Sequence, residues 1–390
     1  MAEKEFEYFK TFHEVTRAVL SALDVRAVLR LITKSIVSSL DIKGSTLMLL
    51  DEKSHRLELV ASHGLSQKYL KKGPLYADRS IADASRGKPV LVENAPADDR
   101  VQYGQEAAEE GIASILSVPM VMRGQFIGVL RIYTSEPRRF SENEMDLISA
   151  IAEIGAIAIE NARIFEAREA ELSKVLKVGG IDYQSELPVA EHHLKPPLKR
   201  GIEHKKSYHH FRTLYRLTRT ITSTMEMKKT LEAVVSEIAK TMGVKGCCLF
   251  WLNTASRELE LLASSGLSNA YLCKGPLSMD KSIPQVFEEL TVFIANVRTD
   301  PAVQYPEAAD QEGILSMLSV PILVREKVRG VLRLYSSMAT AFSTEDLQFA
   351  KVLAEIGGIA IMNAKLHEER ATDIKFWRAT LDYLGIETTQ

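Results

Sequence analysis

Apolar residues recur at helical spacing at the start of the chain, at Phe6, Phe9 and Phe12, and this pattern predicts an amphipathic helix. A second helix is predicted over residues 25–40, with Asp24 as its N-cap. Runs of β-type residues bounded by Gly and polar turns then predict strands over residues 45–51, 57–62, 90–93, 114–122 and 126–133. A closing helix is expected from Ser141, because Ser141 and Glu144 have the spacing of a capping box.

The whole pattern returns after 202 residues without a gap, so that Gly64 corresponds to Gly266 and Arg131 to Arg333. In the block from Gly111 to Tyr133, 13 of 23 positions are identical in the second copy. This period is far longer than the ~20–50 residues of solenoid repeats, so it indicates two domains. We predict domains over 1–170 and 208–370, a linker over 171–207 that is rich in Gly, Pro and His, and an amphipathic helical tail over 371–390.

The order of elements predicts an α+β fold with an antiparallel sheet in each copy. The last two strands are separated by only a short turn at Arg123 and Gly124, which suits a hairpin. Helices before and after the sheet can cover one of its faces together. The segment over 69–111 must then cover the other face.

Strand alternation divides each sheet into two faces. Leu116, Val118 and Met120 form an apolar face that should pack on the helices, whereas Ser117 and Arg131 lie on the opposite face. A few polar groups on an otherwise apolar wall are typical of a small-molecule site. The predicted ligand-binding residues are Ile81, Asp98, Tyr103, Ile115, Ser117, Val129, Arg131 and Tyr133 in the first copy, and Ile283, Asp300, Tyr305, Met317, Ser319, Val331, Arg333 and Tyr335 in the second.

Two alternatives stay open at this site. Arg131 and Arg333 either contact a ligand or form ion pairs with carboxylates of the covering loops, for which Asp98 and Asp300 are candidates. Similarly, Tyr103 and Tyr305, which lie in matching Val-Gln-Tyr segments, either cap a pocket or fill the core of the loops.

Several motifs together resemble GAF domains. The closing segment Arg139-Phe-Ser-Glu-Asn-Glu144 with Ile157-Ala-Ile-Glu-Asn-Ala-Arg163 resembles the last helix of that family, and Ser117-Val-Pro-Met and Gly128-Val-Leu resemble its central strands. The run that begins at Ser80 resembles its segment of helix, glycine, proline and strand. The resemblance implies a central antiparallel sheet with terminal helices on one face and a loop-covered ligand pocket on the other. It also implies a dimeric sensory module that passes a conformational change through its terminal helices.

Other chemistries of the same family fit less well. Cyclic-nucleotide binders of the family often carry Asn-Lys after the last strand and a second acid in the following motif. Here Tyr133-Thr134 replaces the first and Met145 the second. Bilin-binding members of the family use a cysteine beside a histidine in the pocket region, and this chain has no such Cys-His pair. Free-methionine-sulfoxide reductases need several cysteines around the pocket of one domain. Here the first copy has no cysteine, and Cys247, Cys248 and Cys273 of the second copy do not have that arrangement. Histidines of the linker offer a metal site that we consider less favoured than a solvated linker.

Composition bears on the partners and the cellular compartment of the protein. A net charge of −2 argues against a nucleic-acid surface. The chain begins without a signal peptide, its longest apolar run (147–159) is too short to span a membrane, and a design without a disulfide framework fits the cytoplasm.

We therefore expect a cytoplasmic tandem sensor of an unidentified small molecule without its own output domain. It should act as a homodimer or through a partner protein that binds the tail. A scaffold with filled pockets is the alternative, and an enzyme of the sulfoxide reductase type is less favoured. The sequence predicts no catalytic or metal-binding residues, and it leaves the ligand and any cofactor undefined.

Overall fold

The computed structural model describes residues 2–21, 24–51, 53–77, 83–178, 208–223, 226–339 and 342–383. Most of the predicted linker, the end of the predicted tail and the predicted site residue Ile81 therefore lie outside the described residues. Of the linker histidines, His209 and His210 lie in a described helix, and the others lie outside.

The first domain contains α1 (Ala2–Ser21), α2 (Val25–Leu40), β1 (Gly44–Asp51), β2 (Arg56–His63), α3 (Gln67–Leu70), β3 (Leu75–Tyr76), η1 (Ala84–Arg86), β4 (Val90–Val92), α5 (Gly104–Glu110), β5 (Ser114–Met122), β6 (Gln125–Thr134) and α6 (Glu142–Val178). The predicted long strands are present and differ by one residue at most at their ends. The two-residue strand β3 and the short helices of the covering segment were not predicted, because such short elements leave no period in the sequence.

The second domain repeats this order as α7 (Tyr208–Ser223), α8 (Met227–Met242), β7 (Gly246–Asn253), β8 (Glu258–Ser265), α9 (Asn269–Leu272), β9 (Leu277–Ser278), η2 (Pro284–Glu288), β10 (Val292–Ile294), α10 (Pro306–Gln311), β11 (Ser316–Val324), β12 (Lys327–Ser336) and α11 (Thr344–Tyr383). Each domain has a six-stranded antiparallel sheet, with strand order β3-β2-β1-β6-β5-β4 in the first and β10-β11-β12-β7-β8-β9 in the second. The predicted α+β class is confirmed.

Helix starts follow the caps that the sequence predicts. The Asp24 carboxylate accepts a hydrogen bond from the amide of Arg26 at 2.8 Å, which satisfies one free donor of α2. At α6, the Ser141 amide donates to Glu144 Oε2 at 2.8 Å, and the Glu144 amide donates to Ser141 Oγ at 3.3 Å. The capping box is therefore formed, and Ser343 and Asp346 form its counterpart at α11.

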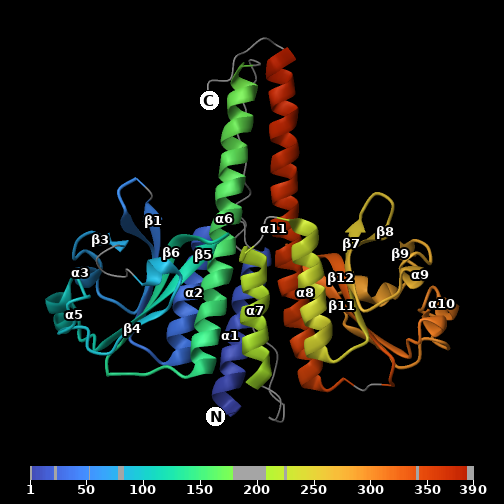
Figure 1. Ribbon diagram of the computed structural model, residues 1–390, viewed down its shortest axis with the longest axis horizontal. Helices are drawn as coiled ribbons and strands as arrows, with labels where there is room; N and C mark the ends of the chain where they lie inside the picture. The colour runs from blue at the N-terminus through green and yellow to red at the C-terminus, as the bar shows by residue number, and fades with distance from the viewer. Residues whose placement is uncertain are drawn as a thin grey trace.

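The two sheets lie on the outside of the molecule and the long helices lie between them (Figure 1). Leu116, Val118 and Met120 of β5 belong to the same buried core as residues of α2 and α6. The residues Ile115, Val129 and Tyr133 belong to separate clusters on the opposite side of the sheet, which we call the far face. The predicted division of the strands into two faces is thus confirmed.

The first helix of each copy reaches across to the other copy. The helices α1, α6, α7 and α11 form a central bundle, and residues of all four belong to one continuous core. At the end of α7, the Thr222 carbonyl accepts a hydrogen bond from the Arg123 amide in the β5–β6 turn, at 2.6 Å. At the end of α1, the Leu20 carbonyl accepts the matching bond from the Arg325 amide in the β11–β12 turn, at 3.2 Å. The apolar stripes of these helices therefore pack helix on helix within one chain.

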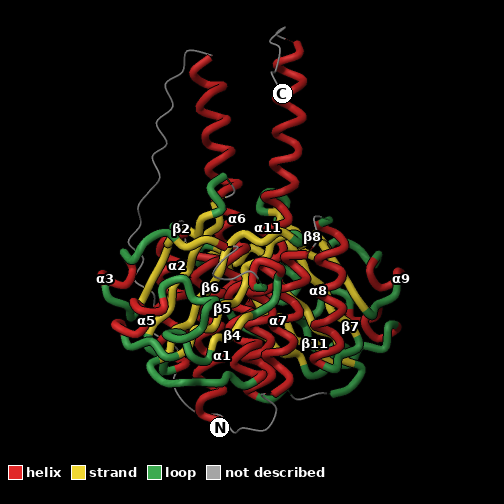
Figure 2. The backbone as a smooth tube through the Cα atoms, turned by 60° about the vertical axis from the view of Figure 1, so that its left-hand side comes forward, coloured by secondary structure: helices red, strands yellow, loops and turns green. Residues whose placement is uncertain are grey.

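Two long helices, α6 and α11, extend in the same direction beyond the body of the molecule, on the side opposite the N-terminus (Figures 1 and 2). The predicted tail is not a separate helix, because α11 continues without a break through residue 371 to Tyr383. The side chain of Trp377 lies outside those described. Within the described chain, Thr344–Leu366 of α11 is long and apolar enough to cross a membrane, but 72% of that window is buried inside the structure, as in the core helix of a folded domain.

Candidate functional site

The far face of each sheet carries a buried arginine. In the first domain, Arg131 of β6 lies opposite Ser117 of β5 and is only 4% exposed. Its Nε donates a hydrogen bond to Ser117 Oγ at 3.2 Å. Strand pairing also places Thr46 of β1 beside Arg131, so three neighbouring strands bring their polar side chains to this point.

A lysine that the sequence reasoning missed joins this arginine. Lys72 follows α3, and its Nζ lies 3.7 Å from the centre of the Tyr69 ring. Burial and the charge of Arg131 lower the pKa of Lys72 to about 8. Tyr69 in turn meets Tyr133 edge to face at 5.8 Å, and the Tyr133 hydroxyl is 3.0 Å from Thr46 Oγ1. We call Thr46, Tyr69, Lys72, Ser117, Arg131 and Tyr133 the first far-face site.

The second domain repeats the arrangement. Arg333 is 3% exposed, its Nη2 donates to the Ser282 carbonyl at 3.1 Å, and its guanidinium lies 5.6 Å from the centre of the Phe250 ring. Lys274 Nζ lies 3.8 Å from the centre of the Tyr271 ring, and burial lowers the pKa of Lys274 to about 8. The second far-face site consists of Cys248, Tyr271, Lys274, Ser319, Arg333 and Tyr335.

The second site contains buried polar atoms without partners. Ser319 Oγ, Arg333 Nε and Tyr335 Oη are all buried and have no hydrogen bond to any described residue. The Tyr335 hydroxyl interacts with Arg333 and the Cys248 thiol without the geometry of a hydrogen bond. Buried polar groups in folded proteins are almost always satisfied, so a cluster of three unsatisfied ones indicates a place for a bound molecule or water.

The expected ion pairs between these arginines and the loop aspartates are wrong. Asp98 is paired with Arg100, with 2.6 Å between Oδ2 and Nη2, and this contact lowers the pKa of Asp98 to about 2. Asp300 accepts a hydrogen bond from the Ala302 amide at 2.9 Å. Both aspartates are held by residues two positions away, which form a local turn at little entropic cost. Among the described residues, no carboxylate lies within ion-pair distance of Arg333.

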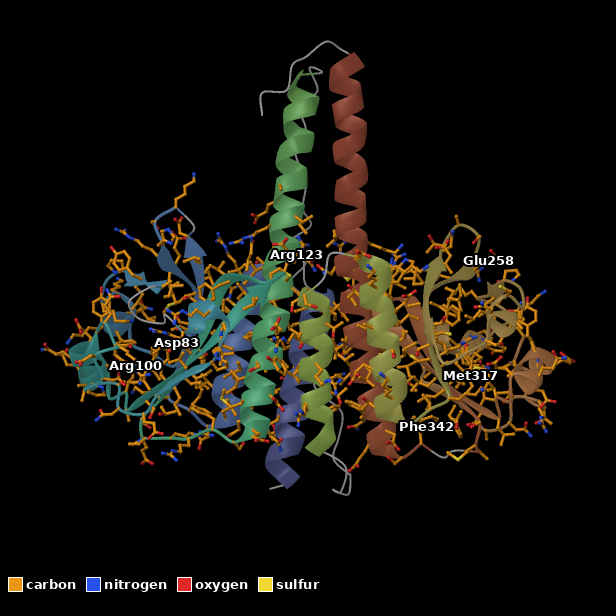
Figure 3. The ribbon with its side chains drawn as sticks, in the orientation of Figure 1. Asp83, Arg100, Arg123, Glu258, Met317 and Phe342 are labelled. Carbon is orange, nitrogen blue, oxygen red and sulfur yellow. The ribbon has the colours of Figure 1, made fainter. Side chains whose placement is uncertain are left out.

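The other predicted site residues fall into two groups. Tyr103 and Tyr305 fill the loop core, because their hydroxyls donate to the carbonyls of Pro74 and Pro276 at 3.0 and 2.9 Å. The apolar residues line the far face in the buried state: Ile115, Val129, Ile283, Met317 and Val331. Figure 3 shows that Met317 of the second far face and Arg100 of the first domain's outer loops both lie away from the central helices, whereas Arg123 lies beside them.

A signal for the missed lysines exists in the sequence. Both copies contain Tyr-Leu-x-Lys-Gly-Pro-Leu, at Tyr69 and at Tyr271, at the same offset of 202 residues as the rest of the repeat. The motif places the tyrosine in a short helix and the lysine directly after it.

Two of the three cysteines are buried in the second domain. Cys247 belongs to the helical core and Cys248 to the far face, so the predicted opposite orientation of their side chains is confirmed. Burial raises the pKa of both, that of Cys248 to about 12, so each remains a protonated thiol at neutral pH. Cys273 is exposed, and within the described part of the chain no three His, Cys, Asp or Glu residues are grouped to hold a metal ion.

Comparisons with known proteins match the duplicated part of the chain. A sequence model of the GAF domain matches residues 22–160 and 224–362, two regions separated by the same 202 residues as the repeat. The formate hydrogenlyase transcriptional activator FhlA of Escherichia coli (strain K12) is 24% identical over 174 residues, which are 42% of this chain and 25% of that protein. This chain therefore matches about a quarter of the length of that relative.

Solved structures with a similar fold include two GAF domains of phosphoenolpyruvate-protein phosphotransferases. The domain from Coxiella burnetii has 24% sequence identity and a TM-score of 0.39, and the match covers 42% of this chain and 98% of that one. The domain from Acinetobacter also has 24% identity, with a TM-score of 0.36, and the match covers 40% and 93% of the two chains.

Proposed function

The chain belongs to the GAF domain family through both of its domains, and we propose that it is a regulatory protein whose second far-face site senses a small anionic molecule. The observation that carries this proposal is the buried guanidinium of Arg333, which has no carboxylate partner among the described residues and stands beside the second cation Lys274. A buried charge without a counter-ion costs several kcal/mol. A bound carboxylate or phosphate would remove that cost.

The geometry of the second site suits such an anion. Arginine presents several donors in a plane and binds carboxylate or phosphate through two hydrogen bonds. Arg333 Nε, Ser319 Oγ and Tyr335 Oη form no well-aligned hydrogen bond with a described residue, although the Tyr335 hydroxyl also lies near Cys248 and Tyr271. Apolar neighbours such as Val331 and Met317 would hold the rest of the ligand.

The two sites differ in how many of their buried polar groups form hydrogen bonds within the protein. In the first site, Ser117 accepts the hydrogen bond of Arg131 Nε, and Thr46 is bonded to Tyr133. In the second site, Cys248 replaces Thr46 and the corresponding polar atoms are unpartnered. We therefore propose that the second domain is the stronger sensor. Because the polar groups of the first site bond to one another, we propose that the first domain has a mainly structural role.

The sheet provides a direct route from the second site to the helices. Ser319 and Arg333 lie on the two strands of the β11–β12 hairpin, and the turn of that hairpin is bonded to Leu20 at the end of α1. A ligand that shifts the strands of this hairpin would therefore move α1 of the other domain. We propose that the projecting helices α6 and α11 pass this change to a protein partner or a second copy in the cytoplasm.

Native mass spectrometry of the freshly purified protein, followed by calorimetric titration with a panel of small carboxylates and phosphates, tests the proposal. We expect a co-purified or added anion to bind with one strong site per chain, and Arg333→Met to abolish that binding. Arg131→Met is the matched control and should preserve it. Binding of neutral analogues with the same affinity, or binding that survives in Arg333→Met, would contradict the anion site.

A further inference from the structure

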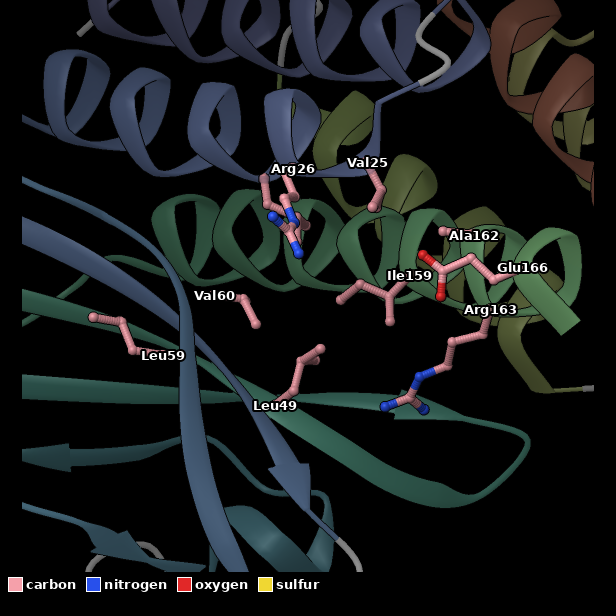
Figure 4. Close-up of a pocket in the computed structure, with 10 residues that line it drawn as sticks. Val25, Arg26, Leu49, Leu59, Val60, Ile159, Ala162, Arg163 and Glu166 are labelled. Carbon is pink, nitrogen blue, oxygen red and sulfur yellow. The ribbon is translucent and has the colours of Figure 1, made fainter. Parts of the chain in front are cut away.

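A separate cavity lies on the helical side of the first sheet, between α2, the β1–β2 edge and α6. Its volume is about 440 Å³, within the range of ~300–1,000 Å³ that is usual for small-molecule sites. Leu29, Leu49, Val60 and Ile159 form apolar parts of its lining (Figure 4). None of these residues belongs to the far-face sites, which lie on the other side of the sheet.

Two arginines stand at the rim of this apolar cavity. Arg26 comes from the first turn of α2 and Arg163 from α6, and both are exposed lining residues (Figure 4). Neither forms an ion pair with a described residue. The carboxylate of Glu166 also lies at the rim, so the three side chains leave one net positive charge. The start of α2 adds the partial positive charge of a helix N-terminus.

The second domain fills the equivalent position with its own side chain. Trp251 corresponds to Leu49 and packs against the helical core. Lys365, which corresponds to Arg163, lies 5.3 Å from the centre of the Trp251 ring. We infer that the Trp251 indole fills the volume that the smaller Leu49 leaves open in the first domain. The ammonium group of Lys365 contacts the Trp251 ring, so it is not available to bind an anion at the rim of a cavity.

We propose that the first-domain cavity binds an amphipathic organic carboxylate, with the apolar chain against Leu29, Leu49 and Ile159 and the carboxylate between Arg26 and Arg163. The apolar lining gains free energy from burying a hydrocarbon chain. Arginine side chains at the mouth select a planar anion over a cation or a neutral head group. This inference is independent of the far-face proposal, because it uses different residues on the opposite side of the sheet.

The position of the cavity connects it to α6. Between Ile159 and Glu166, the residues of α6 change from buried to exposed, where the helix leaves the body. A chain bound against Ile159 and Ala162 would fix the direction of the projecting part of α6. The ligand would thus act on the output helix directly.

Calorimetric titration of the full chain with decanoate tests the inference, with decanol and decyltrimethylammonium as neutral and cationic probes. We expect decanoate to bind at one site per chain and at least ten times more tightly than either probe. Leu49→Trp, which copies the second domain, should weaken decanoate at least tenfold. Equal affinity for the three probes, or unchanged binding in Leu49→Trp, would overturn the proposal.

Two further variants keep the test decisive. Arg26→Gln/Arg163→Gln changes only exposed side chains and should weaken decanoate tenfold while leaving decanol unchanged, even if Leu49→Trp fails to fold. Trp251→Leu and Arg333→Met should both retain the decanoate affinity of the natural protein. A loss of binding in either of them would place the site in the second domain and overturn the assignment.

Discussion

The backbone amide of Arg123, in the β5–β6 turn of the first domain, donates a hydrogen bond to the carbonyl of Thr222 at the end of α7, at 2.6 Å. The same bond joins Arg325 to Leu20 with the roles of the domains reversed, at 3.2 Å. Because both pairs are related by the 202-residue repeat, the two domains face each other across an approximate two-fold axis. The helix that begins each domain therefore stabilises the other domain.

Leu217→Ala should loosen the first domain although the residue belongs to the second. Leu217 of α7 is fully buried in the shared core, and removal of its side chain should cost roughly 2–5 kcal/mol. We expect hydrogen exchange of α6 to become faster in this variant. Leu259→Ala on the far face of the second domain should destabilise the protein without a matching change in α6, and the same exchange pattern in both variants would contradict shared stabilisation.

Arg333→Met and Arg131→Met should have opposite effects on the stability of the ligand-free protein. Arg333 is a buried cation without a carboxylate partner among the described residues, and relief of that cost should outweigh the lost hydrogen bond to the Ser282 carbonyl, so its removal should raise the free energy of unfolding by about 1 kcal/mol. Removal of Arg131 leaves Ser117 without its partner and should lower that free energy by roughly 1–3 kcal/mol. Urea unfolding measures both values, and equal losses would mean that both arginines serve only the fold.

Glu153 of α6 should make the protein less stable as the pH rises. Burial raises the pKa of Glu153 to about 7, above its usual 4.5, although the nearby Thr222 side chain and the charge of Arg219 act to lower it. The folded state therefore holds this proton more tightly than the unfolded state, and the associated stability falls between pH 4.5 and 7 by roughly 2–3 kcal/mol. Glu153→Gln should remove this part of the pH dependence. An identical slope for both proteins in urea unfolding at pH 5 and pH 8 would contradict it.

His13 should also stabilise the protein at low pH and lose this contribution as the pH rises. Burial alone would lower the pKa of His13, but the Glu355 carboxylate, 3.0 Å from its Nε2, outweighs burial and raises the pKa above 6.5. The ion pair therefore stabilises the fold fully below pH 6.5 and is lost as the pH rises through the raised pKa. His13→Tyr, which copies Tyr215 of the second domain, should cost about 1 kcal/mol at pH 5.5 and nothing at pH 8.5. Thermal unfolding at the two pH values checks the difference, and a cost that is the same at both would exclude the ion pair.

The faces of the sheet were predictable because strand alternation is a local property. Leu116 and Ser117 are neighbours in sequence, and the pleat alone places them on opposite faces. The caps at Asp24 and Ser141 follow from equally local chemistry. The partner of Arg131 was not predictable in this way, because the sequence does not show that Asp98 turns back to Arg100.

The contacts of α1 and α7 with the opposite domain could not be predicted from the sequence either. An apolar stripe at Phe12 shows that a helix must be covered, but the stripe has the same form whether a neighbour in the same domain, the other domain or a second chain covers it. The cavity beside Leu49 was missed for a related reason. Its size depends on how closely α2 and α6 approach the sheet edge, and only the comparison of Leu49 with Trp251 points to it.

The bonds from Arg123 to Thr222 and from Arg325 to Leu20 also affect how this protein can evolve. In a symmetric pair of separate subunits, every substitution at the interface occurs twice, so a harmful change is doubled at once. Here both halves of the interface are encoded in one chain, and each position can vary alone. His13 against Tyr215 shows such divergence: one half of the bundle has an ionisable contact from His13 to Glu355, whereas the other half has Tyr215 at the position of His13 and a buried Glu153 at that of Glu355. Each half of the bundle therefore carries its own ionisable group, and a substitution can alter one of them without altering the other.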